Sequence, residues 1–255
     1  MTEPLLKTVG LVRRFGWLVA VDHLTVAIGA GQTVALIGPN GAGKTTVFNV
    51  LSGVLPATAG EVWFRGHDIT GEPPFVIARM GMARTFQITS LLQTLDVRKN
   101  LELAAQGALR TRASPFGSIP HPSEVTERTE AALAMTGLAI LADRPVRELS
   151  HGDQRRVEIA MALAAEPRML LLDEPTQGMS AAETWATVDL IKGLRASRPE
   201  LAILIVEHDI PLVLEVAERI LVLQLGRLIA DGSPDEISAN PEVQAAYLGT
   251  AHAGG

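Results

Sequence analysis

One stretch of the chain, residues 33–46, constrains the fold more than any other and reads TVALIGPNGAGKTT. Residues 33–37 form a short apolar run with β-branched members, which is typical of a buried strand. The residues that follow match the spacing G-x-x-x-x-G-K-[ST] at every fixed position: Gly38, Gly43, Lys44 and Thr45. The sequence therefore predicts a strand, a glycine-rich loop and a helix that begins near Lys44.

The residue types of this loop suit a chain of phosphates. Glycines permit a tight wrap in which several backbone N–H groups converge, and the start of a helix favours negative charge. Lys44 supplies a positive charge for the β- and γ-phosphates, and the Thr45 hydroxyl can bind Mg²⁺. We expect the nucleotide to contact Gly38, Pro39, Asn40, Gly41, Ala42, Gly43, Lys44, Thr45 and Thr46. The alternative, a turn that binds nothing, is disfavoured by the strand that precedes the loop.

The composition excludes several other classes of protein. The chain has 255 residues, of which 47% are hydrophobic and 20% charged, so it can bury the core of a large α/β domain. Its net charge of −6 and the lack of a basic run argue against a nucleic-acid partner. It has no cysteine, which excludes disulfides and zinc–thiolate sites. We expect no signal peptide, and no apolar run approaches the roughly twenty residues that cross a bilayer, so a membrane role would require a partner.

Short apolar runs alternate with helical patterns, which predicts a parallel sheet covered by helices on both faces. Strands are expected at residues 5–12, 24–28, 33–37, 61–64, 169–172, 202–206 and 220–223. We interpret residues 88–165 as a mainly helical insert between two parts of a sheet core, 1–87 and 166–250. Residues 1–250 would form a single domain, and residues 251–255 a short flexible tail.

Two acids follow the predicted strand at 169–172. A phosphate-loop enzyme needs an acidic group for its magnesium and a further group that activates the nucleophile. Asp173 and Glu174 lie where the carboxyl end of a strand meets the ligand crevice. We expect Asp173 to reach Mg²⁺, directly or through water, and Glu174 to polarise a water toward the γ-phosphate. The alternative is a strand end with solvated acids.

Three other positions have both a functional and a structural interpretation. His208 follows another buried run and can hydrogen-bond the γ-phosphate or hold the water and Glu174 in line. Gln87 carries an amide oxygen that can bind Mg²⁺ or sense that water. Phe15 falls in a connection predicted over 13–22, where it can stack on a purine or pack in the sheet. The structural alternative for the two polar residues is that their side chains only complete local hydrogen bonds at the end of a strand.

A serine and a glycine open the helix predicted after residue 150. Ser150 can cap this helix, since Ser150-x-x-Asp153 resembles a capping box. Its hydroxyl and the N–H of Gly152 also make an anion site at the start of a helix. Both interpretations can hold together.

In their order along the chain, these motifs resemble the ATP-binding subunit of an ABC transporter. The resemblance rests on the loop at 38–45, Gln87, LSHGDQ at 149–154, LLLDEP at 170–175 and His208, and it covers nearly the whole chain. The serine–glycine signature separates this family from other phosphate-loop enzymes. The implied fold class is α/β, a RecA-like P-loop NTPase with a mostly parallel sheet core, an N-terminal antiparallel β subdomain and a helical insert.

The resemblance implies a shared site and several partners. Two subunits, identical or different, would pair head to tail around ATP and Mg²⁺. Ser150 and Gly152 of one would clamp the γ-phosphate held by Lys44 of the other, and Phe15 would stack on adenine. The partners would be integral membrane permease subunits and, indirectly, a substrate-binding protein, at the cytoplasmic face of the cell membrane. No nucleic acid is expected.

Three other segments would make contacts in this assembly. Gln87 would begin the loop that links the nucleotide to the permease, and residues 88–94 would face the permease. Residues 178–180 would contact the opposite subunit. The signature departs from the common pattern at His151 and Asp153. Ser180 stands where many relatives have an acid or an amide, so a helix-capping role is the safer expectation for it.

The finer resemblance is to importers of branched-chain amino acids. It rests on ARTFQ at 83–87, VEHD at 206–209 and the tail at 240–249. Urea-type importers and lipopolysaccharide exporters are close alternatives. A non-transport ABC protein would usually carry two such cores or a long coiled coil, and a small-molecule kinase would leave the signature unexplained.

Overall fold

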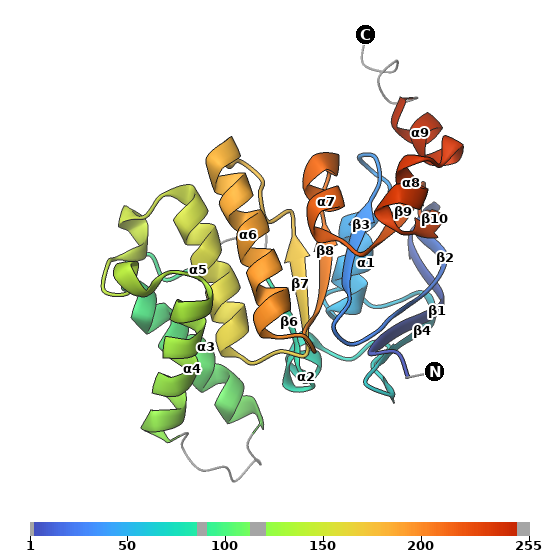
Figure 1. Ribbon diagram of the computed structural model, residues 1–255. Helices are drawn as coiled ribbons and strands as arrows, with labels where there is room; N and C mark the ends of the chain where they lie inside the picture. The colour runs from blue at the N-terminus through green and yellow to red at the C-terminus, as the bar shows by residue number, and fades with distance from the viewer. Residues whose placement is uncertain (1–2, 86–90, 113–120, 249–255) are drawn as a thin grey trace.

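The computed structural model of the protein describes residues 3–85, 91–112 and 121–248. A six-stranded sheet forms its centre, in the order β10, β9, β3, β8, β7 and β6 (Figure 1). The bounds are β3 Thr33–Ile37, β6 Met82–Arg84, β7 Met169–Asp173, β8 Ala202–Val206, β9 Arg219–Gln224 and β10 Arg227–Gly232. Neighbouring strands are parallel, except that β10 is antiparallel to β9. β3, β7 and β8 are buried at every position, which explains their largely apolar sequences.

The N-terminal part of the chain forms a second, antiparallel sheet in the order β2, β1, β4 and β5. Its strands are β1 Leu6–Phe15, β2 Leu18–Ile28, β4 Ala59–Phe64 and β5 His67–Asp68. The predicted connection over 13–22 is wrong in extent, because β1 and β2 continue to a two-residue turn at Gly16 and Trp17. Their pairing passes through register shifts, which keep the residues on both sides of the turn in the ladder. Phe15 therefore ends a strand and is not part of the turn.

Helices cover both faces of the central sheet. Their bounds are α1 Lys44–Leu51, α2 Pro74–Arg79, α3 Val97–Arg112, α4 Pro122–Met135, α5 His151–Ala164, α6 Ala181–Ser197, α7 Ile210–Val216, α8 Pro234–Ser238 and α9 Pro241–Leu248. Alternate side chains of β7 lie on opposite faces of the sheet. Leu170 and Leu172 pack with α5 and α6, whereas Met169 and Leu171 pack in the cluster that contains α1. The α/β fold class expected from the sequence is confirmed.

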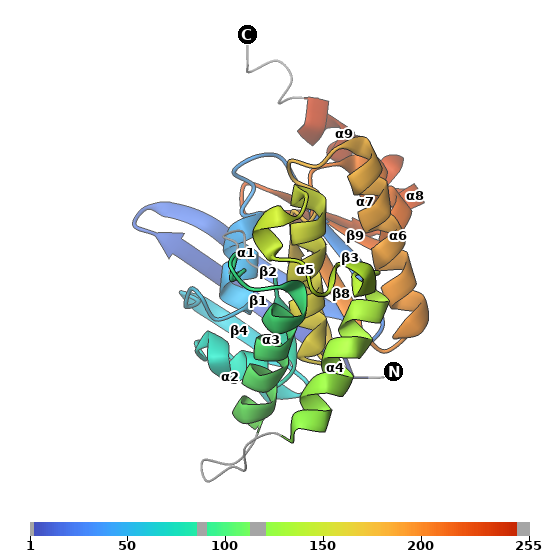
Figure 2. The same cartoon turned by 90° about the vertical axis from the view of Figure 1, so that its left-hand side faces the viewer.

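Helices α3, α4 and α5 lie against one another at one side of the sheet (Figures 1 and 2). Their apolar cluster continues without a break to β7 and β8, through residues such as Leu101, Leu133 and Val157. The division of the chain at residues 88 and 165 stays a prediction.

Three features differ from the sequence analysis or add to it. The antiparallel strand β10 and the short helix α8 were not predicted. Leu91, expected on a surface that faces the permease, is 6% exposed and belongs to the core cluster, whereas Leu92 is 48% exposed. In the described parts of the chain, none of the helices combines the length and the apolar character needed to cross a membrane.

Candidate functional site

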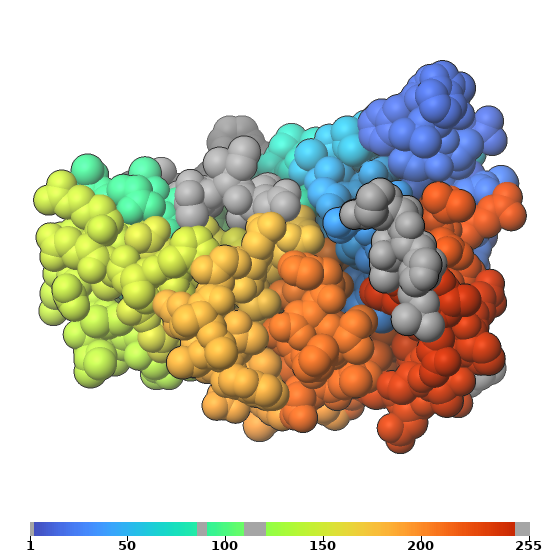
Figure 3. All heavy atoms as spheres, turned by 90° about the horizontal axis from the view of Figure 1, so that it is seen from above, coloured from blue at the N-terminus to red at the C-terminus, as the bar shows by residue number. Residues whose placement is uncertain are grey.

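The glycine-rich loop joins β3 to α1 at the end of the molecule viewed in Figure 3. Gly38, Gly41 and Gly43 have φ values of 152°, 79° and 104°, which side-chain-bearing residues rarely adopt. A Cβ at Gly38 would lie 2.1 Å from the carbonyl oxygen of Leu223, and one at Gly43 would lie 2.2 Å from that of Ala20. Close backbone approach therefore requires glycine at these two positions, in addition to the positive φ.

The start of α1 is open to an anion. Its N-cap, Gly43, provides no capping side chain, and its first turn carries no acid. Lys44 is 7% exposed, and its ammonium donates to the carbonyl oxygens of Gly38 and Pro39, at 2.6 and 3.1 Å. Burial lowers the pKa of Lys44, and the negative charges of Glu174 and Asp173 oppose this. The loop thus holds a buried cation close to both acids that end β7.

Asp173, the last residue of β7, is fully buried. Its Oδ2 accepts a 2.8 Å hydrogen bond from Arg84, and its Oδ1 has no hydrogen-bond partner among the residues described. A buried carboxylate with one oxygen unsatisfied fits a divalent cation, and hydroxyl and carboxylate oxygens are the ligands that Mg²⁺ prefers. Asp173 therefore suits a divalent cation such as Mg²⁺, and Thr45 stays the predicted hydroxyl ligand.

Glu174 has an unusual backbone. Its φ is 45°, a conformation uncommon for residues other than glycine, and its N–H donates to the carbonyl oxygen of Val206 at 2.9 Å. Arg155 of α5 donates to the carbonyl oxygens of both Asp173 and Glu174. Arg155 thus connects α5, the helix that carries the signature, to the backbone at the end of β7.

His208 lies near Glu174. Its Nδ1 is 3.9 Å from Glu174 Oε1 and 3.6 Å from Glu207 Oε2, and its side chain is 58% exposed. Glu207 was not singled out from the sequence, although it is fully buried. It accepts hydrogen bonds from the N–H and hydroxyl of Thr176, at 3.1 and 2.5 Å, and from the N–H of His208. An acid directly after a buried strand was the available signal.

A cavity of about 500 Å³ lies over the loop. Its lining includes Phe15, Leu18, Val19, Ala20, Asn40, Gly41, Ala42, Gly43, Lys44, Thr45, Thr46, Glu174 and Leu225. The Phe15 ring is 42% exposed, and the Arg13 guanidinium lies 4.5 Å from its centroid. The structure thus brings Phe15, most of the loop and Glu174 to one cavity.

The signature lies outside this cavity. Ser150 is the N-cap of α5 and accepts a hydrogen bond from the N–H of Asp153 at 3.1 Å, as predicted for a cap. The N–H of Gly152 donates to Glu183 Oε1 at 3.1 Å, and a Cβ at Gly152 would lie 2.6 Å from that oxygen. Hydrogen bonds from the backbone and hydroxyl of Ser180 lower the pKa of Glu183 to about 2, and Gly152 and Ser150 contribute to the same shift.

Ser180 and Glu183 also form a complete capping box at the start of α6, as the sequence predicted for Ser180. Glu183 therefore joins two helix starts through one carboxylate. Gln87 lies outside the described residues. Sequence reasoning missed the contacts that Arg84, Arg155 and Glu183 make with Asp173, Glu174 and Gly152, because these partners are 18 to 89 residues apart along the chain.

Comparisons with known proteins agree with this geometry. Residues 21–177 match the family model for the ABC transporter, and residues 227–253 match that for the branched-chain amino acid ATP-binding cassette transporter. The chain is 41% identical to the high-affinity branched-chain amino acid transport ATP-binding protein LivG of Escherichia coli K12. It is 40% identical to BraF of Pseudomonas aeruginosa, a protein of the same description. Both alignments cover 98% of this chain and 100% of the relative.

Solved structures show the same likeness. An ATP-binding cassette of an ABC transporter in its ADP conformation superposes with a TM-score of 0.85 and 31% identity, covering 97% of this chain and 100% of that one. A cassette solved as a post-hydrolysis dimer with ADP and Pi gives a TM-score of 0.74 and 25% identity, covering 90% of this chain and 98% of that one. The phosphate loop, the acidic strand and these likenesses together show that the chain belongs to the ABC transporter family, as an ATP-binding subunit that hydrolyses ATP.

Proposed function

We propose that the protein is the motor of an importer and that its active site is shared between two paired ATPase chains. The observation that carries this proposal is the separation described above. The loop and Glu174 line one cavity, whereas Ser150 and Gly152 do not contribute to it. A second chain, identical to this one or a related subunit, supplies the signature to the phosphate held by the loop. The post-hydrolysis dimer of a similar cassette supports such pairing.

Each predicted site residue has a defined part in the proposed reaction. Lys44 and the loop N–H groups bind the β- and γ-phosphates, and Phe15 stacks on adenine. Thr45 and Asp173 hold Mg²⁺, which when bound neutralises charge on the β- and γ-phosphates. Glu174 accepts a proton from the attacking water, and His208, 3.9 Å from it, helps to hold that water in line. Gln87 completes the magnesium and water contacts.

The signature must exchange one anion for another when the chains pair. In the separate chain, the Glu183 carboxylate occupies the N–H of Gly152 and contacts the Ser150 hydroxyl. These are the same donors that the γ-phosphate of the second chain requires. In our proposal ATP-driven pairing therefore displaces Glu183 from the signature.

Branched-chain amino acids are the cargo that the comparisons support best. The relatives at 40–41% identity are transport proteins for these amino acids, and the C-terminal match at 227–253 is specific to that type. The alternatives are a urea-type importer and a lipopolysaccharide-type exporter. The protein then works at the cytoplasmic face of the cell membrane, with permease subunits and, indirectly, a substrate-binding protein.

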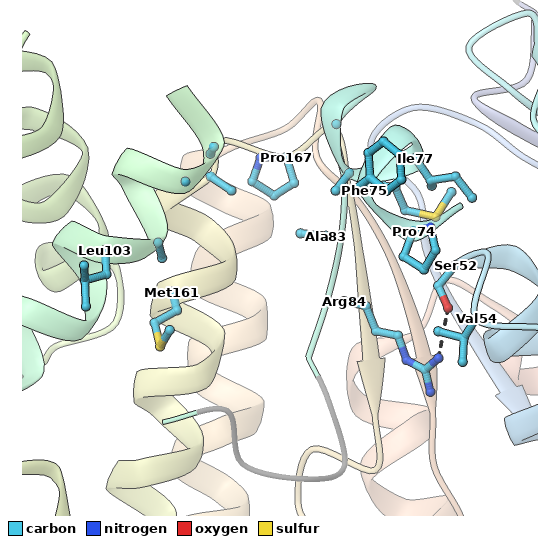
Figure 4. Close-up of a pocket in the computed structure, with 17 residues that line it drawn as sticks. Ser52, Val54, Pro74, Phe75, Ile77, Ala83, Arg84, Leu103, Met161 and Pro167 are labelled. Atoms are coloured by element: carbon cyan, nitrogen blue, oxygen red, sulfur yellow. Dashed lines mark hydrogen bonds between the residues drawn. The ribbon is translucent and has the colours of Figure 1, made fainter. Parts of the chain in front are cut away.

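A groove gives the permease a docking position. It has a volume of about 370 Å³ and lies between α3 and α5 on one side and α2, β6 and the end of α1 on the other (Figure 4). Its lining is largely apolar, and Val54, Phe75 and Leu103 are 46%, 56% and 40% exposed. β6, which lines the groove, ends at Arg84, three residues before Gln87 in the sequence. We assign the groove to an apolar cytoplasmic segment of the permease.

The shared site is tested with Glu174→Gln, which keeps the shape of the side chain and removes the base. We expect this variant to bind ATP, to lose turnover by orders of magnitude and to elute as an ATP-dependent dimer in size-exclusion chromatography with light scattering. Wild-type turnover would remove Glu174 from its role, and a monomer at saturating ATP would contradict the paired site.

The groove is tested with two exposed helix glycines. A Cβ at Gly107, in the groove, or at Gly193, on α6, meets nothing within 4 Å, so both accept a larger side chain. Gly107→Trp should fold and bind ATP but lose permease-dependent stimulation of the ATPase, whereas Gly193→Trp should keep it. Equal stimulation of the two variants would overturn the docking assignment.

A further inference from the structure

Arg84 is a buried arginine placed between three elements of the site. It ends β6 and pairs with Leu171 of β7, two residues before Asp173. Its Nη2 donates to Asp173 Oδ2 at 2.8 Å, and the two side chains are 8% and 1% exposed. This is a desolvated, charge-assisted hydrogen bond, the kind whose geometry is most costly to disturb.

The second terminal nitrogen of the guanidinium is bound to the helix that follows the phosphate loop and to its C-cap. This nitrogen, Nη1, donates to Asn49 Oδ1 at 2.7 Å and to the Ser52 hydroxyl at 2.9 Å. The guanidinium also lies 5.7 Å from the ring centroid of Phe48. The planar fork of arginine can make these contacts at once, whereas a lysine ammonium is a single point of charge. Arg84 thus fixes the acidic strand relative to α1, which begins with Lys44 and Thr45.

One oxygen of Asp173 remains after these contacts. Oδ2 is bound by Arg84, whereas Oδ1 is buried without a hydrogen-bond partner among the described residues. A carboxylate held by one oxygen cannot rotate freely, so the position of the other oxygen is defined before a ligand arrives. The cost of leaving Oδ1 unsatisfied is recovered when a cation binds it.

The same side chain belongs to the groove. Arg84 and Ser52 are among the lining residues of the groove, and the hydrogen bond between them is visible in Figure 4. The side chain of Arg84 therefore connects Asp173 to the groove that we assign to the permease.

We propose that Arg84 is a positioning residue for the divalent cation of the ATPase site. It holds Asp173 by Oδ2, keeps Oδ1 available to the ion, and fixes that oxygen relative to the helix that carries Thr45. The inference rests on the proposed magnesium role of Asp173 and Thr45. A purely structural ion pair between Arg84 and Asp173 would instead support the fold without changing the affinity for the ion.

The test measures binding of Mn²⁺, used in place of Mg²⁺, to the purified protein with saturating ADP, by electron paramagnetic resonance. Arg84→Lys keeps the positive charge and loses the fork. We expect Mn²⁺ to bind about tenfold more weakly, as expected for the loss of one charge-assisted hydrogen bond to a ligand carboxylate. ADP affinity in EDTA should stay unchanged. Arg79→Lys, at an exposed arginine 5.3 Å from the Phe75 ring, is the matched control and should bind Mn²⁺ like wild type.

Two results would overturn the inference. The first is wild-type Mn²⁺ affinity in Arg84→Lys. A purely structural ion pair predicts this result, together with a lowered melting temperature. The second comes from a double-mutant cycle with Asp173→Asn. If Arg84 acts through Asp173, then Arg84→Lys adds no further loss of Mn²⁺ affinity in that background, and an additive loss contradicts it. Failure of the wild-type protein itself to bind Mn²⁺ with ADP would instead reject the proposed magnesium site.

Discussion

The two ends of the proposed shared site are built differently within one chain. The loop end is assembled around a buried cation, with Lys44 at 7% exposure and Gly38 and Gly43 packed against neighbouring backbone. At the signature end Ser150 is exposed and Gly152 is buried, and the Gly152 N–H already donates to Glu183. One end is ready for a phosphate, whereas the other must release a carboxylate first. Nucleotide binding and chain pairing are therefore separable steps, and variants at the two ends should fail at different steps.

The largest effect is expected at the loop end. Lys44→Ala removes the buried cation and should weaken ATP binding to the single chain by at least about tenfold, since a charge-assisted contact to phosphate is lost. Isothermal titration calorimetry measures this. Lys192→Ala, which removes an exposed lysine paired with Glu215, should leave ATP affinity unchanged. Full ATP affinity in Lys44→Ala would contradict the role of the loop end as the nucleotide-binding part of the site.

A change at the signature end should affect pairing alone. Gly152→Ala places a Cβ within 2.6 Å of Glu183 Oε1, at the point where the γ-phosphate of the second chain is expected. In a Glu174→Gln background, we expect normal ATP affinity and loss of the ATP-dependent dimer in light scattering. Gly193→Ala, on an open helix surface, is the control. A normal dimer with Gly152→Ala would remove the signature from the shared site.

A smaller effect in the opposite direction is expected from Glu183→Gln. Glutamine preserves the capping box of α6 but removes the charge that holds the Gly152 N–H. In the Glu174→Gln background, the dimer should form at a lower ATP concentration than with Glu183 intact. A higher requirement for ATP would show that Glu183 supports the paired state and does not compete with the phosphate.

The smallest effect concerns pH. Hydrogen bonds from Ser180, Gly152 and Ser150 lower the pKa of Glu183 to about 2, so its contribution to stability is present above the unfolded pKa of roughly 4.3 and is lost as the pH falls toward 2. The melting temperature of wild type should exceed that of Glu183→Gln by a constant amount near neutral pH, and the gap should shrink below about pH 4. A gap that stays constant to pH 3 would contradict the assigned hydrogen bonds.

The sequence predicted what is local and missed what is distant. The loop followed from residue spacing, because the strand, the turn and the helix start are neighbours along the chain. The caps at Ser150 and Ser180 were predicted for the same reason. The contact of Gly152 with Glu183 spans 31 residues and that of Arg84 with Asp173 spans 89, so no local pattern could indicate either one. Phe15 was misplaced in a turn because β1 and β2 stay paired as far as Phe15 and Leu18 through register shifts that no local pattern indicates.

The most direct measurement of the central claim is cross-linking between two copies of the protein. The chain has no cysteine, so single cysteines can be introduced without removing others. Asn40→Cys at the loop and Ser150→Cys at the signature, both exposed and each combined with Glu174→Gln, would be mixed with a short thiol cross-linker, with and without ATP. We predict a heterodimeric product that forms only with ATP. Equal yields in the presence and absence of ATP, or no product although ATP binds, would contradict a site shared between two chains.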